Sequence, residues 1–204
     1  AANNVGVGYF ALRQNTTGTA NVAVGKATLE SATTADGNTA VGYASQDNTT
    51  TGANNTALGR HSMDGNTTGA DNVGVGAYAL AANTTASNNT AVGKSALYAN
   101  TTGGNNVALG NSALGANTTA SYNTAVGYNN MTSNTTGSHN VALGFEALKD
   151  NVSGSSNTAI GLYALFDNTA SNNTAVGRDA LKLNTSGTYN VAMGLESLDA
   201  NTTG

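Results

Sequence analysis

The chain has 204 residues, a formal net charge of −4 and only 9% charged residues, with no proline, cysteine or tryptophan. The low charge excludes the basic surface that nucleic-acid binding needs, and the lack of cysteine excludes disulfide and thiolate-metal frameworks. No run approaches the ~20 apolar residues of a transmembrane helix, so we expect no membrane insertion by this segment.

One pentapeptide, Asn89–Gly93, recurs through the chain and sets its organisation. Its glycine returns every 17 residues from Gly8 to Gly161, then after 16 residues at Gly177 and after 17 at Gly194. Twelve copies with one deletion predict a single repeat domain over residues 1–204, built by stacking similar units. Because both ends read as ordinary repeat text, we expect the domain to be a segment of a longer fibrous chain.

The elements follow when the repeat is numbered from that asparagine as position 1. Positions 2 and 4 are β-branched or bulky and position 3 is Ala or Gly, which predicts a strand over positions 1–4. The glycine at position 5 predicts a turn, and we expect a second extended piece near positions 7–10 and a third segment at 12–14. The chain is therefore predicted to be an all-β parallel β-solenoid of twelve coils.

The same numbering predicts an interior and two polar ladders. Positions 2, 4 and 9 are expected to face inward, which makes Val92, Leu97, Leu109 and Leu114 core residues, and position 3 is expected to face outward. Asparagines at positions 1 and 12 are expected to chain their amides from coil to coil. The predicted ladder and turn residues are Asn38, Asn55, Asn72, Asn89, Asn106 and Asn123, with Gly42, Gly59, Gly76, Gly93, Gly110 and Gly127.

The hexads Asn88–Gly93 and Asn105–Gly110 resemble the head repeat of trimeric autotransporter adhesins, which has the form Asn-Ser-Val-Ala-Ile-Gly. The resemblance implies a left-handed parallel β-roll with three chains side by side. The longer repeat used here, with Ala-Leu and Asn-Thr-Thr following, is also similar to repeat regions of bacterial surface fibres and phage tail fibres. A thin core and a small outward residue at position 3 independently favour a homotrimer.

These features predict a structural or adhesive fibre segment, extracellular or on the cell surface, that serves as an adhesin head or shaft. The expected partners are further copies of the chain and a host-surface or matrix ligand that the sequence does not identify. Alternatives are the shaft of a phage tail fibre, on a virion, and a glycan-coated filament that assembles end to end.

Candidate sites are few. His61 and His139 lie in distant coils without a recurring serine or carboxylate partner, so we expect no enzyme, no catalytic residue and no cofactor. Glu30, Asp47 and Asp64 occupy position 10 in three consecutive coils and are weak candidates for a cation site. A solvated acidic edge is the favoured interpretation, and no metal is expected.

The Asn-Thr-Thr segment allows two further hypotheses. It matches the N-glycosylation pattern at Asn15, Asn66, Asn83, Asn100, Asn117 and Asn134, although a laddered turn accounts for the same residues. Threonine rows also suggest an ice-binding solenoid, but adjacent threonines cannot both face outward from a strand. Aromatic residues gather at positions 6 and 7, where packing between chains is favoured over ligand stacking.

Overall fold

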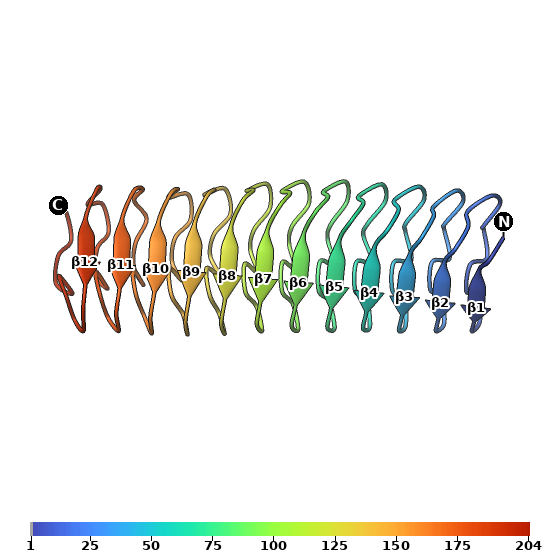
Figure 1. The fold of residues 1–204 in the computed structure, drawn as a ribbon, viewed down its shortest axis with the longest axis horizontal. Coiled ribbons are helices and arrows are strands. Elements are labelled where there is room, and N and C mark those ends of the chain that lie inside the picture. The colour runs from blue at the N-terminus through green and yellow to red at the C-terminus, as the bar shows by residue number, and fades with distance from the viewer. Residues whose placement is uncertain (1) are drawn as a thin grey trace.

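The computed structural model describes residues 2–204, which form a straight rod with the two termini at opposite ends (Figure 1). Each coil contributes one three-residue strand, and the strands form a single parallel sheet in sequence order. Within the described residues there is no helix long and apolar enough to cross a membrane. The strands are β1 (Val5–Val7), β2 (Val22–Val24), β3 (Thr39–Val41), β4 (Thr56–Leu58), β5 (Val73–Val75), β6 (Thr90–Val92), β7 (Val107–Leu109), β8 (Thr124–Val126), β9 (Val141–Leu143), β10 (Thr158–Ile160), β11 (Thr174–Val176) and β12 (Val191–Met193).

Neighbouring strands pair so that each repeat position lies beside itself. Thr90 is opposite Val107 and Ala91 is opposite Ala108. The coil that lacks one residue keeps this register, because Ala159 still pairs with Ala175. The predicted all-β parallel β-solenoid with a 17-residue spacing is therefore confirmed, and its successive coils rise by about 4.8 Å along the rod.

The orientation of the strand is the reverse of the prediction. Ala91 and Ala108, at position 3, are fully buried, whereas Val92 is 38% exposed and Leu109 is 36% exposed. The prediction that Val92 and Leu109 are core residues is therefore wrong. The argument for a trimer from a small outward residue at position 3 fails with it, because that row faces the interior.

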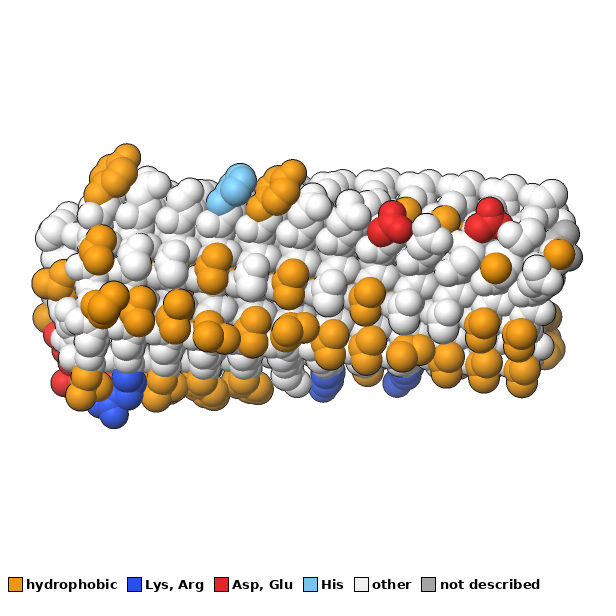
Figure 2. Space-filling model, in the orientation of Figure 1, with side chains coloured by type: hydrophobic (Ala, Val, Ile, Leu, Met, Phe, Trp, Pro, Cys, Tyr) orange, Lys and Arg blue, Asp and Glu red, His pale blue; other side chains and the backbone are white. Residues whose placement is uncertain are grey.

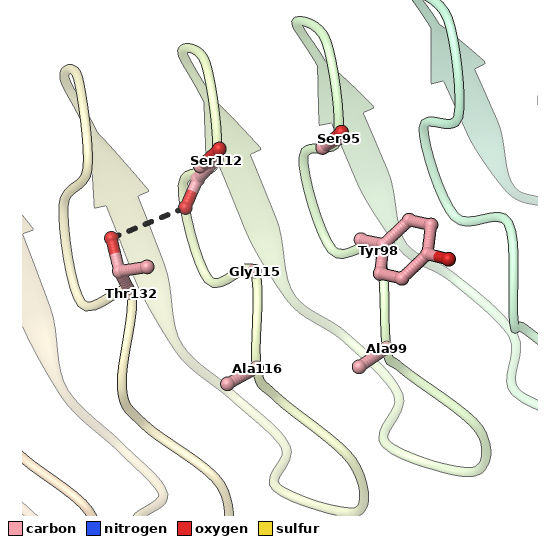
Figure 3. Close-up of a pocket in the computed structure, with 7 residues that line it drawn as sticks. All are labelled: Ser95, Tyr98, Ala99, Ser112, Gly115, Ala116 and Thr132. Atoms are coloured by element: carbon pink, nitrogen blue, oxygen red, sulfur yellow. Dashed lines mark hydrogen bonds between the residues drawn. The ribbon is translucent and has the colours of Figure 1, made fainter.

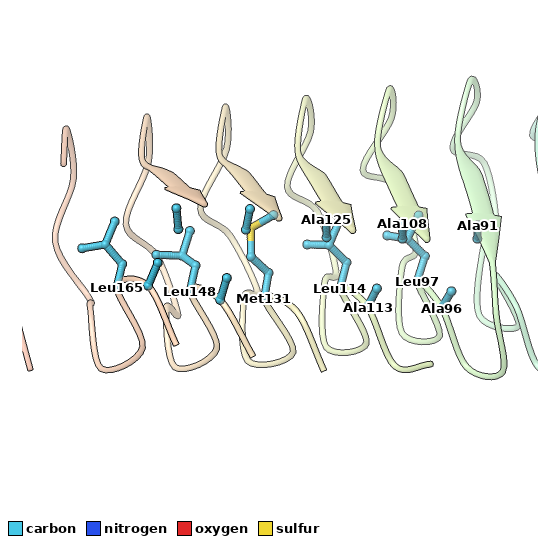
Figure 4. Packing of buried hydrophobic residues seen from close by; sticks show 14 of the residues in the cluster. Ala91, Ala96, Leu97, Ala108, Ala113, Leu114, Ala125, Met131, Leu148 and Leu165 are labelled. Carbon is cyan, nitrogen blue, oxygen red and sulfur yellow. The ribbon is translucent and has the colours of Figure 1, made fainter. Parts of the chain in front are cut away.

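The interior has room for one large side chain per coil, and position 9 supplies it. Leu97 and Leu114 are fully buried and stack along the rod axis between alanines from positions 3 and 8 (Figure 4). Where position 3 lacks a side chain, at Gly74, an added Cβ would lie 3.1 Å from Cε of Met63. A valine or leucine at position 3 would therefore collide with the position-9 row, and the large residues of the strand face outward.

Positions 6–11 form a turn-rich segment, so the predicted extended piece near 7–10 is wrong. Ser95 at position 7 has φ of 56° and Leu97 at position 9 has φ of 50°, both in the left-handed region. This conformation costs an L-residue roughly 1–2 kcal/mol. Burial of the leucine side chain, worth about 1.5–3 kcal/mol, offsets the cost, and the Leu97 N–H donates to the Ala113 carbonyl of the next coil at 3.0 Å.

Glycine at position 5 ends each strand for two reasons. Gly93 has φ of 134°, which side-chain-bearing residues rarely adopt, and a Cβ there would collide with the carbonyl oxygen of Gly110 in the next coil. The invariance of this position therefore follows from the close stacking of the corners.

We expect Leu97→Ala to lower the free energy of unfolding by about 2–5 kcal/mol, because it opens a cavity in the single row of large core side chains. Urea denaturation followed by far-UV circular dichroism measures the effect. The matched control is Leu183→Ala, since Leu183 is 44% exposed and its truncation should change stability by no more than about 0.5 kcal/mol. Equal losses in the two variants would show that position 9 is not the core.

Candidate interaction surface

The asparagine row at position 1 links the coils from inside. Asn89 is fully buried, its Oδ1 accepts the Asn106 N–H at 2.9 Å, and its Nδ2 donates to the Gly103 carbonyl at 3.0 Å. Each amide therefore joins its own coil to the next one. The structure places all six predicted ladder asparagines, fully buried, in this row: Asn38, Asn55, Asn72, Asn89, Asn106 and Asn123.

A second asparagine row, at position 12, converges on the same carbonyls. Asn100 Nδ2 donates to Asn83 Oδ1 at 3.0 Å and to the Gly103 carbonyl at 2.9 Å. The Gly103 carbonyl thus accepts from both asparagine rows. Two buried amide ladders that share an acceptor satisfy polar groups that would otherwise cost about 1–3 kcal/mol each.

The predicted N-glycosylation sites are not available in the fold. Asn66, Asn83, Asn100, Asn117 and Asn134 are fully buried, and Asn15 is partly buried. Each of the six amide nitrogens donates to the backbone carbonyl three residues ahead. A glycan on that nitrogen would break the ladder and occupy the interior, so none of these six asparagines can carry one in the folded rod.

The outward side of the sheet is an apolar stripe, which we define as the side chains at positions 2 and 4 of all twelve strands. Position 4 is Val, Leu, Ile or Met in every coil, and position 2 is Val or Thr. These side chains are half-buried or exposed, with Leu143 at 46%. Figure 2 shows an unbroken row of hydrophobic side chains along the rod, with a sparser parallel row beside it.

Aromatic and basic residues at positions 6 and 7 border this stripe. Tyr128 stacks on Phe145 with ring centroids 5.4 Å apart. The Lys26 ammonium lies between Tyr9 and Tyr43, 6.0 Å and 5.8 Å from their ring centroids. The aromatic side chains therefore extend the apolar face along one edge of the sheet.

The threonines of the Asn-Thr-Thr segment divide into two rows. Thr101 is half-buried and its hydroxyl donates to the Thr118 carbonyl at 3.0 Å, whereas Thr102 is exposed. A flat ice-binding face would use two parallel rows of outward threonines, whereas this segment exposes only the row that contains Thr102.

Two of the three acidic residues in the position-10 row have ion-pair partners of their own. Glu30 pairs with Arg13 at 3.1 Å, and Asp64 pairs with His61 at 2.9 Å. Burial, followed by repulsion from Asp64 and Glu30, raises the pKa of Asp47 above its usual value. No group of three or more His, Cys, Asp or Glu side chains within residues 2–204 is arranged to hold a metal ion.

The structure does not bring the two histidines together. His61 stacks on Tyr78 with ring centroids 5.4 Å apart, whereas His139, four to five coils farther along the rod, stacks on Tyr122.

A shallow depression of about 440 Å³ lies in the coils between the two histidines, where Gly115 at position 10 leaves a gap beside Tyr98 (Figure 3). Its walls carry hydroxyl groups and alanines but no charged side chain.

The outward apolar stripe is the surface feature that the sequence pattern did not lead us to predict. A signal was present in the sequence. Position 2 exchanges Val for Thr from coil to coil, which a tightly packed interior tolerates poorly, whereas position 3 is restricted to Ala and Gly.

Comparisons of the chain with protein-family models, with curated proteins and with solved structures find no match.

We expect Asn100→Ala to lower the free energy of unfolding by about 1–3 kcal/mol, because it leaves buried partners in the ladder unpaired. Asn100→Asp should cost more at neutral pH, since it buries a charge without a cationic partner, and should recover in part when acid protonates the carboxyl. Chemical denaturation at two pH values measures both effects. Asn111→Ala, at an exposed position, is the control, and a comparable loss there would contradict a special role for the ladder.

We expect Asp47→Asn to stabilise the fold at neutral pH. A carboxyl whose pKa is raised in the folded state binds its proton more tightly there, so its ionisation destabilises the fold as pH rises above its unfolded pKa. The gain from the substitution should shrink as pH falls toward 4 and below, where Asp47 is protonated in both states. Denaturation midpoints across that range measure the gain, with exposed Asp199→Asn as control, and a gain independent of pH would refute the assignment.

Proposed function

We propose that this chain is a structural segment of an extracellular fibre, such as an adhesin head or a fibre shaft. In this proposal three copies pack side by side as left-handed β-rolls through their apolar stripes. The single observation that carries the proposal is the stripe itself, because all twelve coils present a large apolar side chain outward at position 4.

The size of the stripe supports a partner. Twelve coils at a rise of ~4.8 Å and three strand residues at ~3.3 Å give a strip of roughly 50 Å by 10 Å. Soluble monomers rarely leave contiguous apolar patches larger than a few hundred Å² exposed. The aromatic residues of position 6, such as Tyr128 and Phe145, widen the strip on one side, and aromatic side chains are typical of subunit contacts.

The choice of a copy of the same chain rests on the uniformity of the stripe. A repeat that presents the same two positions over the full rod matches an equally long and regular partner, and another copy of the chain has that property. The number three and the left hand come from the resemblance of Asn88–Gly93 to the head repeats of trimeric adhesins.

The proposed role is mechanical. Buried amide ladders and in-register strands make a rod that holds its outer side chains at fixed spacing, and stripe packing would convert three thin rods into one thicker fibre. The alternative function, the shaft of a phage tail fibre, would use the same rigid rod. The host-surface or matrix ligand of an adhesin head would bind to the outer faces of the rods that stay exposed in the trimer.

We expect the chain to sediment as a trimer at micromolar concentration and Val92→Lys to weaken its association at least about a hundredfold, because the lysine would be buried at the interface without a partner. Sedimentation velocity over a range of concentrations measures this, and circular dichroism checks the fold of each variant.

The matched control is Val152→Lys. Val152 is also an outward valine, 46% exposed against 38% for Val92, but it lies in the Asn-Thr-Thr segment and outside the stripe. Its substitution should leave association unchanged. A wild-type chain that is a folded monomer at this concentration, or equal effects of the two substitutions, would overturn the proposal.

A further inference from the structure

Charged side chains lie at the two ends of the short strands, on either side of the apolar stripe. Position 6 directly follows the turn glycine and carries cations in four coils, at Lys26, Arg60, Lys94 and Arg178. Positions 16 and 17 lie just before the buried asparagine that precedes the next strand, and they carry carboxylates in two coils, at Asp36 and Asp71. In Figure 2 the basic side chains on this face line one edge of the hydrophobic row, and two acidic side chains lie beyond the opposite edge.

Five of these six edge charges form no ion pair within residues 2–204 of the chain, and Arg178 is the exception. Arg13, Lys149, Arg178 and Lys182 each form an ion pair with a carboxylate of the same chain. Within the described residues 2–204, by contrast, no ion pair involves the following five exposed residues: Lys26, Arg60, Lys94, Asp36 and Asp71. The unpaired cations and the unpaired carboxylates are thus separated by the width of the sheet.

Both carboxylates are held in place from one side. Asp36 Oδ1 accepts hydrogen bonds from the Thr19 backbone N–H at 2.6 Å and from the Thr19 hydroxyl at 2.9 Å. Asp71 Oδ1 accepts from Asn54 Nδ2 at 3.2 Å. In each carboxylate one oxygen is engaged in this way, and within residues 2–204 no hydrogen bond involves the other oxygen, Oδ2.

The cations are steadied on the opposite edge by aromatic rings. The Lys26 ammonium lies between Tyr9 and Tyr43, and the Arg60 guanidinium lies 5.6 Å from the centroid of Tyr78. Such contacts restrict long side chains without neutralising their charge. Both edges thus present ordered charges of opposite sign.

The spacing of the two sets matches. Lys26 and Arg60 are 34 residues apart, which is two coils, and Asp36 and Asp71 are 35 residues apart, which is two coils and one position. Both pairs of charges are therefore separated by about 10 Å along the rod. A single relative height of two neighbouring chains brings both pairs together.

We propose, on the basis of the trimer proposed above, that these charges set the register between chains: Lys26 and Arg60 of one chain pair with Asp36 and Asp71 of the next. In a closed three-fold ring, the end of the strand in one chain meets the beginning of the strand in its neighbour. Such a ring permits no net shift along the axis, so equivalent coils lie level. The members of each pair are then within about one coil rise of each other in height, well within reach of a lysine or arginine side chain.

Site-specific cross-linking tests this register, because the chain contains no cysteine and every introduced thiol is unique. A tagged Lys26→Cys chain and an untagged Asp36→Cys chain are co-expressed and treated with a short bismaleimide. We expect a cross-linked dimer of one tagged and one untagged chain. The matched control combines Lys94→Cys with Asp36→Cys; the four additional coils move the thiol about 19 Å along the rod, and the mixed product should be lost.

A second measurement tests the charges themselves. In low salt, the trimer of the double variant Lys26→Asp, Arg60→Asp should be weaker than the wild-type trimer and should dissociate at a higher protein concentration. Adding Asp36→Lys and Asp71→Lys to the same chain should restore association. At about 1 M salt, where the screening length is near 3 Å, the difference should disappear.

The outcomes separate the two proposals. A trimer in sedimentation that gives no mixed cross-link, or gives equal yields for the matched and control pairs, overturns the register but leaves the trimer in place. Failure of the added lysines to restore association also overturns the pairing. A chain that sediments as a monomer overturns the proposed function, and the register with it.

Discussion

Hydrogen bonding between buried asparagine amides is the constraint on which the rest of this rod depends. The amide oxygen of Asn89 accepts a backbone N–H from the next coil, while its nitrogen donates to a carbonyl of its own coil. Aspartate lacks the donor, leucine lacks both functions, and glutamine places the amide one methylene farther out. The continuous asparagine row at position 1 therefore ties successive coils together in register, and the row at position 12 adds to it in the coils that carry asparagine there.

The narrow cross-section limits the interior to alanines and a single row of large side chains at position 9. Leucine occupies this row in the left-handed region of φ, so its burial offsets a backbone conformation that it otherwise avoids. Where Gln46 takes the place of leucine, its Oε1 has no hydrogen-bond partner. The hydrophobic core divides there, with one cluster ending at Ala40 and the other beginning at Ala57.

A full interior also explains the outer surface. The bulky residues of the strand have no room inside, so they form an apolar stripe along the sheet. A surface of this regularity is costly to expose to water, and its removal from water by identical chains is the basis of the proposed fibre. In the proposed trimer, the charges at its edges would distinguish an aligned neighbour from a displaced one, which apolar contacts alone do poorly because every coil resembles the next.

The sequence by itself determined the period, the parallel stack, the strand before each glycine and the amide ladders, because these follow from spacing and from the hydrogen-bonding capacity of asparagine. It could not determine which side of the strand faces inward. Alternation shows that Thr90 and Val92 share a face, and an apolar face can be buried in a core or in an interface. Only the closed coil decided that alanine lies inside and valine outside. Its interior holds the Leu97 side chain, and the space that remains at position 3 fits an alanine such as Ala91 but no larger side chain.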